Sequence, residues 1–239
     1  MFLYETHMHT SQVSKCGTAT PQEQVRAYKA RGYTGVIVTD HFLNGHAHQP
    51  GKMSHQKLME FFMSGYDMAK NEGDKIGLDV FFGWEYAVDG HDFLTYGLGL
   101  DFLIKHPEML RTMPIDAYSK AVREAGGYLC QAHPFREAVW IENPGAVDAS
   151  LLDGIEVYNA SDQKHTNQKA YDFAKKHHLA MQSGSDSHSE HLDIVSGICL
   201  NEKAQSIHDI IHAIKSHQAG LIISDQDVAL SDRLIPWET

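Results

Sequence analysis

The chain has 239 residues, 42% of them apolar, and a formal net charge of −11 at neutral pH. This length and composition favour one domain with a complete core, and the acidity argues against a broad basic surface that binds nucleic acid. The sequence shows no run of 18 apolar residues and no basic-then-apolar leader, so we expect neither a membrane span nor a secretory signal.

The cysteines indicate a reducing compartment. There are three, Cys16, Cys130 and Cys199, and they are widely separated in the sequence. An odd and scattered set does not suit a disulfide framework, whereas it does suit a reducing cytoplasm. We therefore predict a cytoplasmic protein.

Strand and helix signals alternate along the chain. Short β-branched runs bounded by glycine, such as Gly35–Val38, predict buried strands, and Thr20-Pro21-Gln22-Glu23 has the N-cap, proline and acidic first turn of a helix start. Alternation of this kind is typical of parallel strands with helices packed outside them. The predicted strands are 1–9, 35–38, 79–87, 93–99, 128–132, 153–159, 179–183, 195–200 and 220–224, the predicted helices are 21–31, 56–71, 114–125, 163–177 and 206–217, and 225–239 is an irregular tail of the same domain, 1–239.

Two histidines follow the first apolar run. His7 and His9 are two residues apart, so in a strand their side chains point to the same face, with Cα atoms roughly 6.6 Å apart. Two imidazoles at that separation can bind one cation. A lone His-x-His is weak evidence, so this hypothesis requires matching ligands at other strand ends.

Further histidines and carboxylates stand at the carboxyl ends of other predicted strands. In parallel α/β folds this rim is where active sites are built. Burying bare His, Glu and Asp side chains together is costly unless something pairs them, and cations can do that. Asp186 and His188 repeat the two-residue spacing of the first pair. The full set at the predicted rim is His7, His9, His41, Glu85, His133, Asp186 and His188.

The segments that carry these residues resemble the motifs of the PHP (polymerase and histidinol phosphatase) superfamily. They occur in the family's order and cover most of the chain. The resemblance implies an α/β fold, a distorted (β/α)7 TIM-like barrel, that uses two to three divalent metal ions to hydrolyse phosphate esters. The segments are His7-Met8-His9, Thr39-Asp40-His41, Gly83-Trp84-Glu85, Ala132-His133-Pro134 and Gly184-Ser185-Asp186-Ser187-His188.

The resemblance also implies how the ligands are shared between the first two metals. Glu85 would bridge them, and the last ligand of the second metal would follow the third strand. At that position we prefer Asp92 to the adjacent His91. The first metal would take His7, His9, Glu85 and Asp186, and the second Glu85, His133 and Asp92.

The third metal would take His41, His188 and a residue from the loop after the first strand. Many family members place Asp or His in that loop, and this chain departs from them with Ser14-Lys15-Cys16. Cys16 is a candidate thiolate ligand, and a neutral filler is the alternative. Whether the third position is occupied stays open.

We expect hydrolysis of a small phosphorylated substrate, in which two cations share and activate the attacking water. Glu85 and Asp186 would be essential through the metals. Arg136 could clamp a phosphate in bidentate fashion, and either Asp40 or His165 could protonate the leaving oxygen. Imidazole and carboxylate ligands suit Zn, Mn or Fe and do not choose among them.

Two alternatives remain at this point. A C–N hydrolase of the amidohydrolase type also begins with His-x-His on a barrel strand, although Glu85 and the Asp-x-His segment fit that pattern poorly. A metal-binding module without catalysis, or an accessory module acting on nucleic acid, is the other, and the net charge of −11 argues against a nucleic-acid groove. The identity of the substrate and the oligomeric state are left open.

Overall fold

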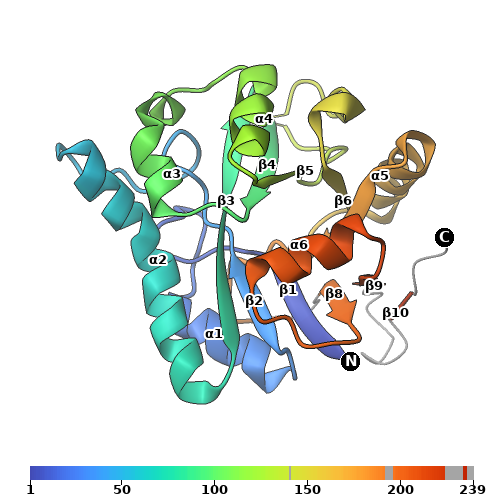
Figure 1. Ribbon diagram of the computed structural model, residues 1–239, viewed down its shortest axis with the longest axis horizontal. Coiled ribbons are helices and arrows are strands. Elements are labelled where there is room, and N and C mark those ends of the chain that lie inside the picture. The colour runs from blue at the N-terminus through green and yellow to red at the C-terminus, as the bar shows by residue number, and fades with distance from the viewer. Residues whose placement is uncertain (140, 192–195, 224–233, 236–239) are drawn as a thin grey trace.

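The computed structural model describes residues 1–139, 141–191, 196–223 and 234–235. Its strands form one mixed sheet. The sheet curls until β7 (Ala180–Gly184) approaches β1 (Phe2–Met8), where Thr6 Oγ1 donates to the carbonyl of Ser183 over 2.8 Å. The result is a nearly closed, distorted TIM-like α/β barrel, as predicted (Figure 1). Across the sheet the described strands are β10 (Leu234–Ile235), β9 (Gly220–Ile222), β8 (Gly197–Leu200), β1 (Phe2–Met8), β2 (Gly35–Val38), β3 (Asp79–Val88), β4 (His91–Tyr96), β5 (Tyr128–Gln131), β6 (Gly154–Asn159) and β7 (Ala180–Gly184).

Helices lie around the strands, with α2 (His55–Ile76) at the left and α5 (Lys164–His177) at the right of the view in Figure 1. Thr20 caps the first helix in a capping box with Glu23, as the sequence indicates. Helix α2 continues to Ile76, beyond the predicted end at residue 71, and stops where Gly77 adopts a φ of 70°. The described helices are α1 (Pro21–Ala30), α2 (His55–Ile76), α3 (Leu100–Lys105), α4 (Ile115–Glu124), α5 (Lys164–His177) and α6 (Ile207–Lys215), of which α3 was not predicted.

Strand β4 corrects the expectation of parallel strands throughout. It is antiparallel to both β3 and β5, and β8 and β9 also pair in antiparallel fashion. The turn between β3 and β4 is Asp89-Gly90, with φ of 50° and 83°, the left-handed pair that makes a tight hairpin. Because β4 runs backwards, its first residues, including Asp92, lie at the same rim as the end of β3.

Strand β10 lies in the region that was predicted to be an irregular tail. Within the predicted irregular tail, Leu234 and Ile235 form β10 and pair with β9, so this part of the prediction was wrong. The rest of the tail and the predicted strand start at residue 195 lie outside the described residues.

The interior of the barrel is packed beneath the rim. Tyr96 is fully buried, and its hydroxyl donates to the carbonyl of Thr6 over 2.7 Å and accepts from Gln182 Nε2 over 2.8 Å. Under the outer helices, Trp84 is also fully buried and donates from Nε1 to the hydroxyl of Tyr118 over 2.8 Å. Each buried aromatic ring removes about 150–250 Å² from water. This packing fixes the strands whose ends carry the candidate ligands.

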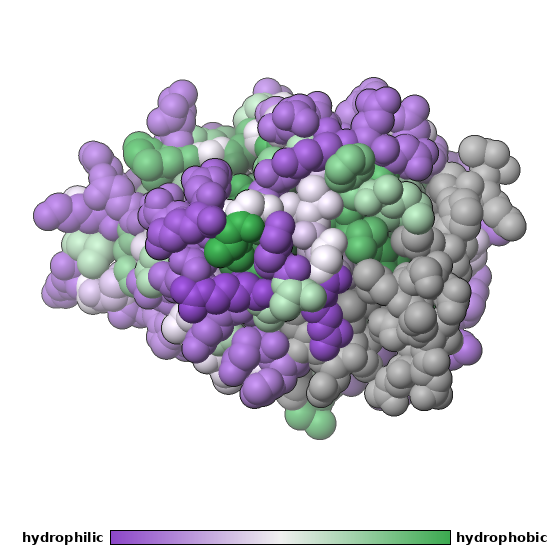
Figure 2. All heavy atoms as spheres, turned by 90° about the horizontal axis from the view of Figure 1, so that it is seen from below, coloured by the Kyte–Doolittle hydropathy of each residue, from purple (hydrophilic) through white to green (hydrophobic). Residues whose placement is uncertain are grey.

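The described surface is mainly polar on the face shown in Figure 2, where apolar residues form separate groups among hydrophilic ones. Large apolar side chains that are exposed include Met1, Met53 and Val139. None of the described helices combines the length and the apolar character that crossing a membrane would require.

Candidate metal centre

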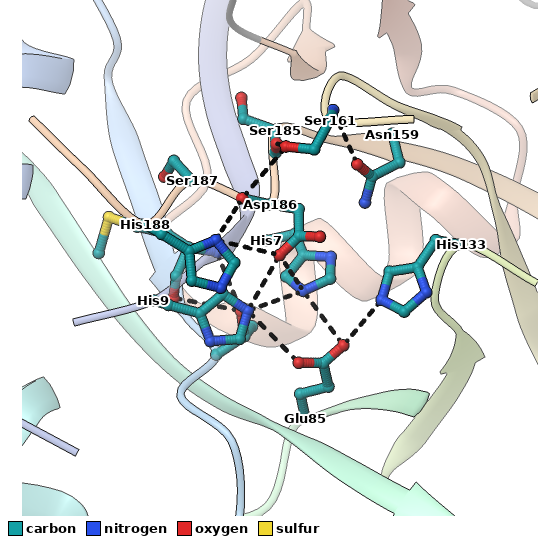
Figure 3. A network of polar contacts seen from close by, with 12 residues as sticks. His7, His9, Glu85, His133, Asn159, Ser161, Ser185, Asp186, Ser187 and His188 are labelled. Atoms are coloured by element: carbon teal, nitrogen blue, oxygen red, sulfur yellow. Dashed lines mark hydrogen bonds and ion pairs between the residues drawn. The ribbon is translucent and has the colours of Figure 1, made fainter. Parts of the chain in front are cut away.

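The ends of β1, β3 and β7 bring four predicted ligands together (Figure 3). His7 Nε2 and His9 Nε2 are 3.1 Å apart, and Asp186 Oδ1 lies 3.4 Å from the first and 3.2 Å from the second. The two carboxylate oxygens of Glu85 lie 3.4 Å from His7 Nε2 and 3.3 Å from His9 Nε2. Ligand atoms about 2.0–2.1 Å from a tetrahedral ion are about 3.3 Å from one another. His7 and His9 therefore have the spacing of ligands around one cation, with Glu85 as a third member of their group and Asp186 at the same spacing from both histidines.

The outer hydrogen bonds engage Nδ1 of both histidines and direct both Nε2 atoms into the cluster. His7 Nδ1 is 3.0 Å from Glu156 Oε1, and because a carboxylate only accepts, Nδ1 must carry the proton. His9 Nδ1 is 3.1 Å from Ser14 Oγ, whose own proton goes to Asp40 Oδ1 over 2.7 Å, so His9 Nδ1 also donates. The two Nε2 atoms thus face each other at 3.1 Å, each on the side of its ring opposite the donating Nδ1. A cation between them satisfies both.

The buried carboxylates of the cluster also favour a positive charge beside them. Burial would lower the pKa of His7, but Asp186, Glu156 and Glu85 outweigh burial and raise that pKa well above its usual value. Burial would raise the pKa of Glu85, but His41 and His7 outweigh it and hold the pKa well below the usual range. The carboxylates are therefore ionised, and either a protonated His7 or a metal ion must balance them.

Glu85 also faces His133 and His41, which belong to two different ligand groups, His133 with His7 and Asp186, and His41 with Glu85 and Asp92. One of its oxygens, Oε1, lies 3.1 Å from His133 Nε2. The other, Oε2, is 2.8 Å from His41 Nδ1, yet it accepts no hydrogen bond of normal geometry from any described residue. A buried oxygen left in this state is costly, and a bound cation would satisfy it. Asp92 completes the group with His41 and Glu85, each with a ligand atom within 4.8 Å of the others.

The reversed strand β4 separates Asp92 from its neighbour His91. Asp92 shares a face of the β3–β4 hairpin with Glu85, because it lies two residues from Leu94, the partner of Glu85. His91 lies on the opposite face, and its Nδ1 is 3.4 Å from Gln131 Nε2. Asp92 therefore lies on the face that carries Glu85, and His91 does not.

Two of the candidate ligands have backbone conformations that residues other than glycine rarely adopt. The φ angle is 28° at His133 and 52° at Asp186. His133 is held by its own N–H, which donates to Glu156 Oε2 over 3.0 Å. Backbone strain of this kind concentrates at functional sites, where the surroundings fix a side chain in a required direction.

A third group contains the cysteine of the loop after β1. His9, Cys16, His41 and His188 each offer a ligand atom within 4.8 Å of the others. Burial opposes ionisation of the Cys16 thiol, but hydrogen bonds with His188 and His41 outweigh burial and lower its pKa to about 7. The predicted members of the third site therefore do meet.

The structure places Arg136 against a candidate ligand. Its Nη2 lies 2.7 Å from Asp186 Oδ2 and 3.1 Å from Asn159 Oδ1, and its Nε lies 2.5 Å from Asp162 Oδ1. The guanidinium therefore holds Asp186 with Oδ1 directed at the two histidines.

The two predicted general acids occupy different surroundings. Asp40 is buried, and its carboxylate accepts from the Thr10 N–H over 2.6 Å, the Thr10 hydroxyl over 2.7 Å and Ser14 Oγ over 2.7 Å. Asp40 is connected to His9 through Ser14 Oγ. His165 is half exposed and pairs with Glu137 at 3.2 Å, so it is not part of the cluster.

Two carboxylates that support the ligands, Glu5 and Glu156, were not predicted from the sequence. Glu156 orients His7 and His133, as described above. Glu5 is fully buried and accepts from the N–H of His7 over 2.7 Å and of Ser185 over 2.9 Å, which ties β1 to the loop that carries Asp186. The available signal was a glutamate inside an otherwise apolar strand, since such a charge is not buried without partners.

Comparison with known proteins gives the fold. No protein-family model matches the sequence, and no curated protein matches it. A two-domain protein from Bacteroides vulgatus that contains a predicted PHP-like metal-dependent phosphoesterase matches 93% of this chain at 17% identity and a TM-score of 0.65. This chain spans 64% of that protein, less than two thirds of its length.

Two further structures share the fold under other names. An amidohydrolase from Chromobacterium violaceum matches 88% of this chain and 96% of its own, at 16% identity and a TM-score of 0.56. A lesion-specific endonuclease from Pyrococcus furiosus matches 95% of this chain and 60% of its own, at 14% identity and a TM-score of 0.60. The fold of this chain is therefore the one found in PHP-like metal-dependent phosphoesterases, as its sequence motifs indicate.

Proposed function

We propose that the chain is a metal-dependent hydrolase of small phosphate esters, with two to three divalent cations at the rim of the barrel. The observation that carries the proposal is the meeting of His7 Nε2 and His9 Nε2 with the carboxylates of Glu85 and Asp186 at 3.2–3.4 Å. Divalent cations held there would lower the pKa of water and neutralise charge on phosphoryl oxygens. Zn, Mn and Fe suit this mixed donor set.

Glu85 has the central role in this proposal. Its carboxylate faces His7 and His9 on one side and His41 and His133 on the other. A carboxylate in that position can bridge two cations, which brings the substrate and a water molecule to one place.

Arg136 and Asp40 act on the ligands in this proposal. Arg136 is engaged with Asp186 and Asp162, so it sets the direction of the Asp186 carboxylate. Asp40 acts through Ser14 on the orientation of His9. We therefore infer positioning roles for both, in place of the phosphate clamp and the general acid that were candidate roles from the sequence.

The test combines elemental analysis with a panel of phosphomonoesters and small phosphodiesters, for the chain and for Glu85→Gln. We expect phosphate release by the metal-loaded chain, and loss of both bound metal and turnover in Glu85→Gln. The matched control is Glu124→Gln, because Glu124 is exposed on α4 and pairs only loosely with Lys120 at 3.9 Å. A Glu85→Gln chain with full metal content and turnover would reject the proposal.

The structural neighbours supply two alternatives that the same panel separates. Release of ammonia from amide or amidine substrates, without release of phosphate, would favour a C–N hydrolase. Salt-dependent binding and cleavage of single-stranded DNA would favour action on nucleic acid, against the expectation from the net charge of −11.

A further inference from the structure

Cys16 gives the third ligand group a chemistry that the other groups lack. It lies with His41, His188 and His9, and each offers a ligand atom within 4.8 Å of the others. Within the part of the chain that the structure describes, the remaining groups with this spacing combine imidazole and carboxylate only. Sulfur is a soft donor, whereas carboxylate oxygen is a hard one.

His9 belongs to the neighbouring carboxylate group. Its Nδ1 donates to Ser14 Oγ, so it can offer only Nε2 to a metal. That atom lies 3.3 Å from Glu85 Oε2 and 3.2 Å from Asp186 Oδ1. Without His9, the ligand group that contains Cys16 has three protein ligands, Cys16, His41 and His188.

The hydrogen bonds around His188 and Cys16 direct their ligand atoms together. His188 Nδ1 donates to the carbonyl of Asp186 over 2.8 Å, which leaves Nε2 as the ligand atom. The Sγ of Cys16 lies within 4.8 Å of a ring nitrogen of both His41 and His188.

The loop that carries Cys16 is fixed on both sides of the thiol. Lys15 N–H donates to the carbonyl of His46 over 2.9 Å, and Thr18 N–H donates to the carbonyl of His188 over 2.7 Å. The backbone also passes so close to Thr10 that a Cβ at Gly17 would meet its carbonyl carbon at 2.6 Å. The thiol is thus held against the two imidazoles by the loop itself.

We propose that Cys16, His41 and His188 form a thiolate site that selects a soft divalent cation such as Zn²⁺, beside a harder site formed by His7, His9, Glu85 and Asp186. Three protein ligands leave one tetrahedral position open. The inference rests on the proposed loading of the rim with metal, and it adds that adjacent positions hold different metals. Manganese is disfavoured at the thiolate site because it prefers oxygen ligands.

The test uses Co²⁺ as a spectroscopic probe of the full chain after removal of metal. Thiolate ligation of Co²⁺ produces an intense charge-transfer band in the near ultraviolet, and imidazole and carboxylate ligation do not. We expect this band in the wild-type chain and its loss in Cys16→Ala. Cys199→Ala is the matched control, since Cys199 is buried in β8 and belongs to no described ligand group, and it should keep the band.

A second measurement tests selectivity directly. The chain is dialysed against equimolar Zn²⁺ and Mn²⁺ and its metal content is measured, together with that of Cys16→Asp, which replaces sulfur by oxygen. We expect the variant to exchange one equivalent of Zn for Mn, with an unchanged circular dichroism spectrum.

Absence of the thiolate band from the wild-type chain at saturating Co²⁺, or its persistence in Cys16→Ala, would overturn the inference. Unaltered Zn and Mn content in Cys16→Asp would overturn the claim of selectivity. Neither measurement uses a substrate. An intact band in a chain that releases no phosphate would reject the proposed function and leave the thiolate site standing.

Discussion

Replacing Glu156 with glutamine tests whether the carboxylate behind His7 controls metal binding. Glu156 Oε1 accepts the Nδ1 proton of His7 over 3.0 Å, and Oε2 accepts from the N–H of His133 over 3.0 Å and from Asn159 Nδ2 over 2.9 Å. Glutamine keeps the shape of the side chain but replaces one acceptor oxygen with an amide NH₂ group. It therefore removes the negative charge and leaves at least one donor without its partner.

The expected size of the effect follows from these contacts. Loss of an outer carboxylate partner of a ligating histidine typically weakens metal binding by about 10–100-fold, or about 1.4–2.8 kcal/mol. The tautomer of His7 is then no longer fixed, so Nε2 can carry the proton and cease to be a ligand. The loss of a buried hydrogen bond to a charged acceptor also lowers the free energy of unfolding of the metal-free chain by about 1.5–3 kcal/mol.

The assay is a competition titration of the metal-free chain with Zn²⁺ and a chromogenic chelator, run beside urea unfolding. Glu156→Gln should show the weakened affinity, and Glu124→Gln, on the exposed face of α4, should bind as the wild type does. A folded Glu156→Gln chain with wild-type metal affinity would refute the reasoning, because His7 would then need no orienting partner.

Further outcomes can be measured on the same material. Glu85→Gln and Asp186→Asn should each lose bound metal by elemental analysis and phosphate release in parallel, and metal retention in either would show that it is not a ligand. Asp40→Asn should lower the free energy of unfolding by about 1–3 kcal/mol in urea, since one of its three buried donors loses an acceptor. Because the pKa of the Cys16 thiol is lowered to about 7, its alkylation in the metal-free chain should accelerate as pH rises and reach half its maximum near pH 7; a midpoint near pH 9 would contradict this. Zinc at 100 times its dissociation constant should raise the free energy of unfolding by about 2.7 kcal/mol relative to chelator, and equal melting temperatures with and without zinc would count against a site formed by folding.

Local rules were sufficient for much of the fold. The capping box at Thr20 and Glu23, and the buried run Gly35–Val38, were predicted because caps and strand periodicity depend on residues close in sequence. The same holds for His7 and His9, whose two-residue spacing on a strand places both on one face. The Asp-Gly pair at residues 89 and 90 is also a local signal for a hairpin turn. The hairpin of β3 and β4 was not predicted because a wholly parallel sheet was expected.

The sequence by itself therefore determined the class of fold and the side chains at its rim, because these follow from patterns within single elements. Only the tertiary structure decided which groups face each other. Glu156 meets His7 across 149 residues of chain, Arg136 holds Asp186, and the thiol of Cys16 meets His41 and His188. These contacts depend on how strands that are distant in sequence pack together. A local sequence pattern does not determine the separations of a few ångströms that decide whether a side chain is a ligand, supports a ligand, or lies outside the site.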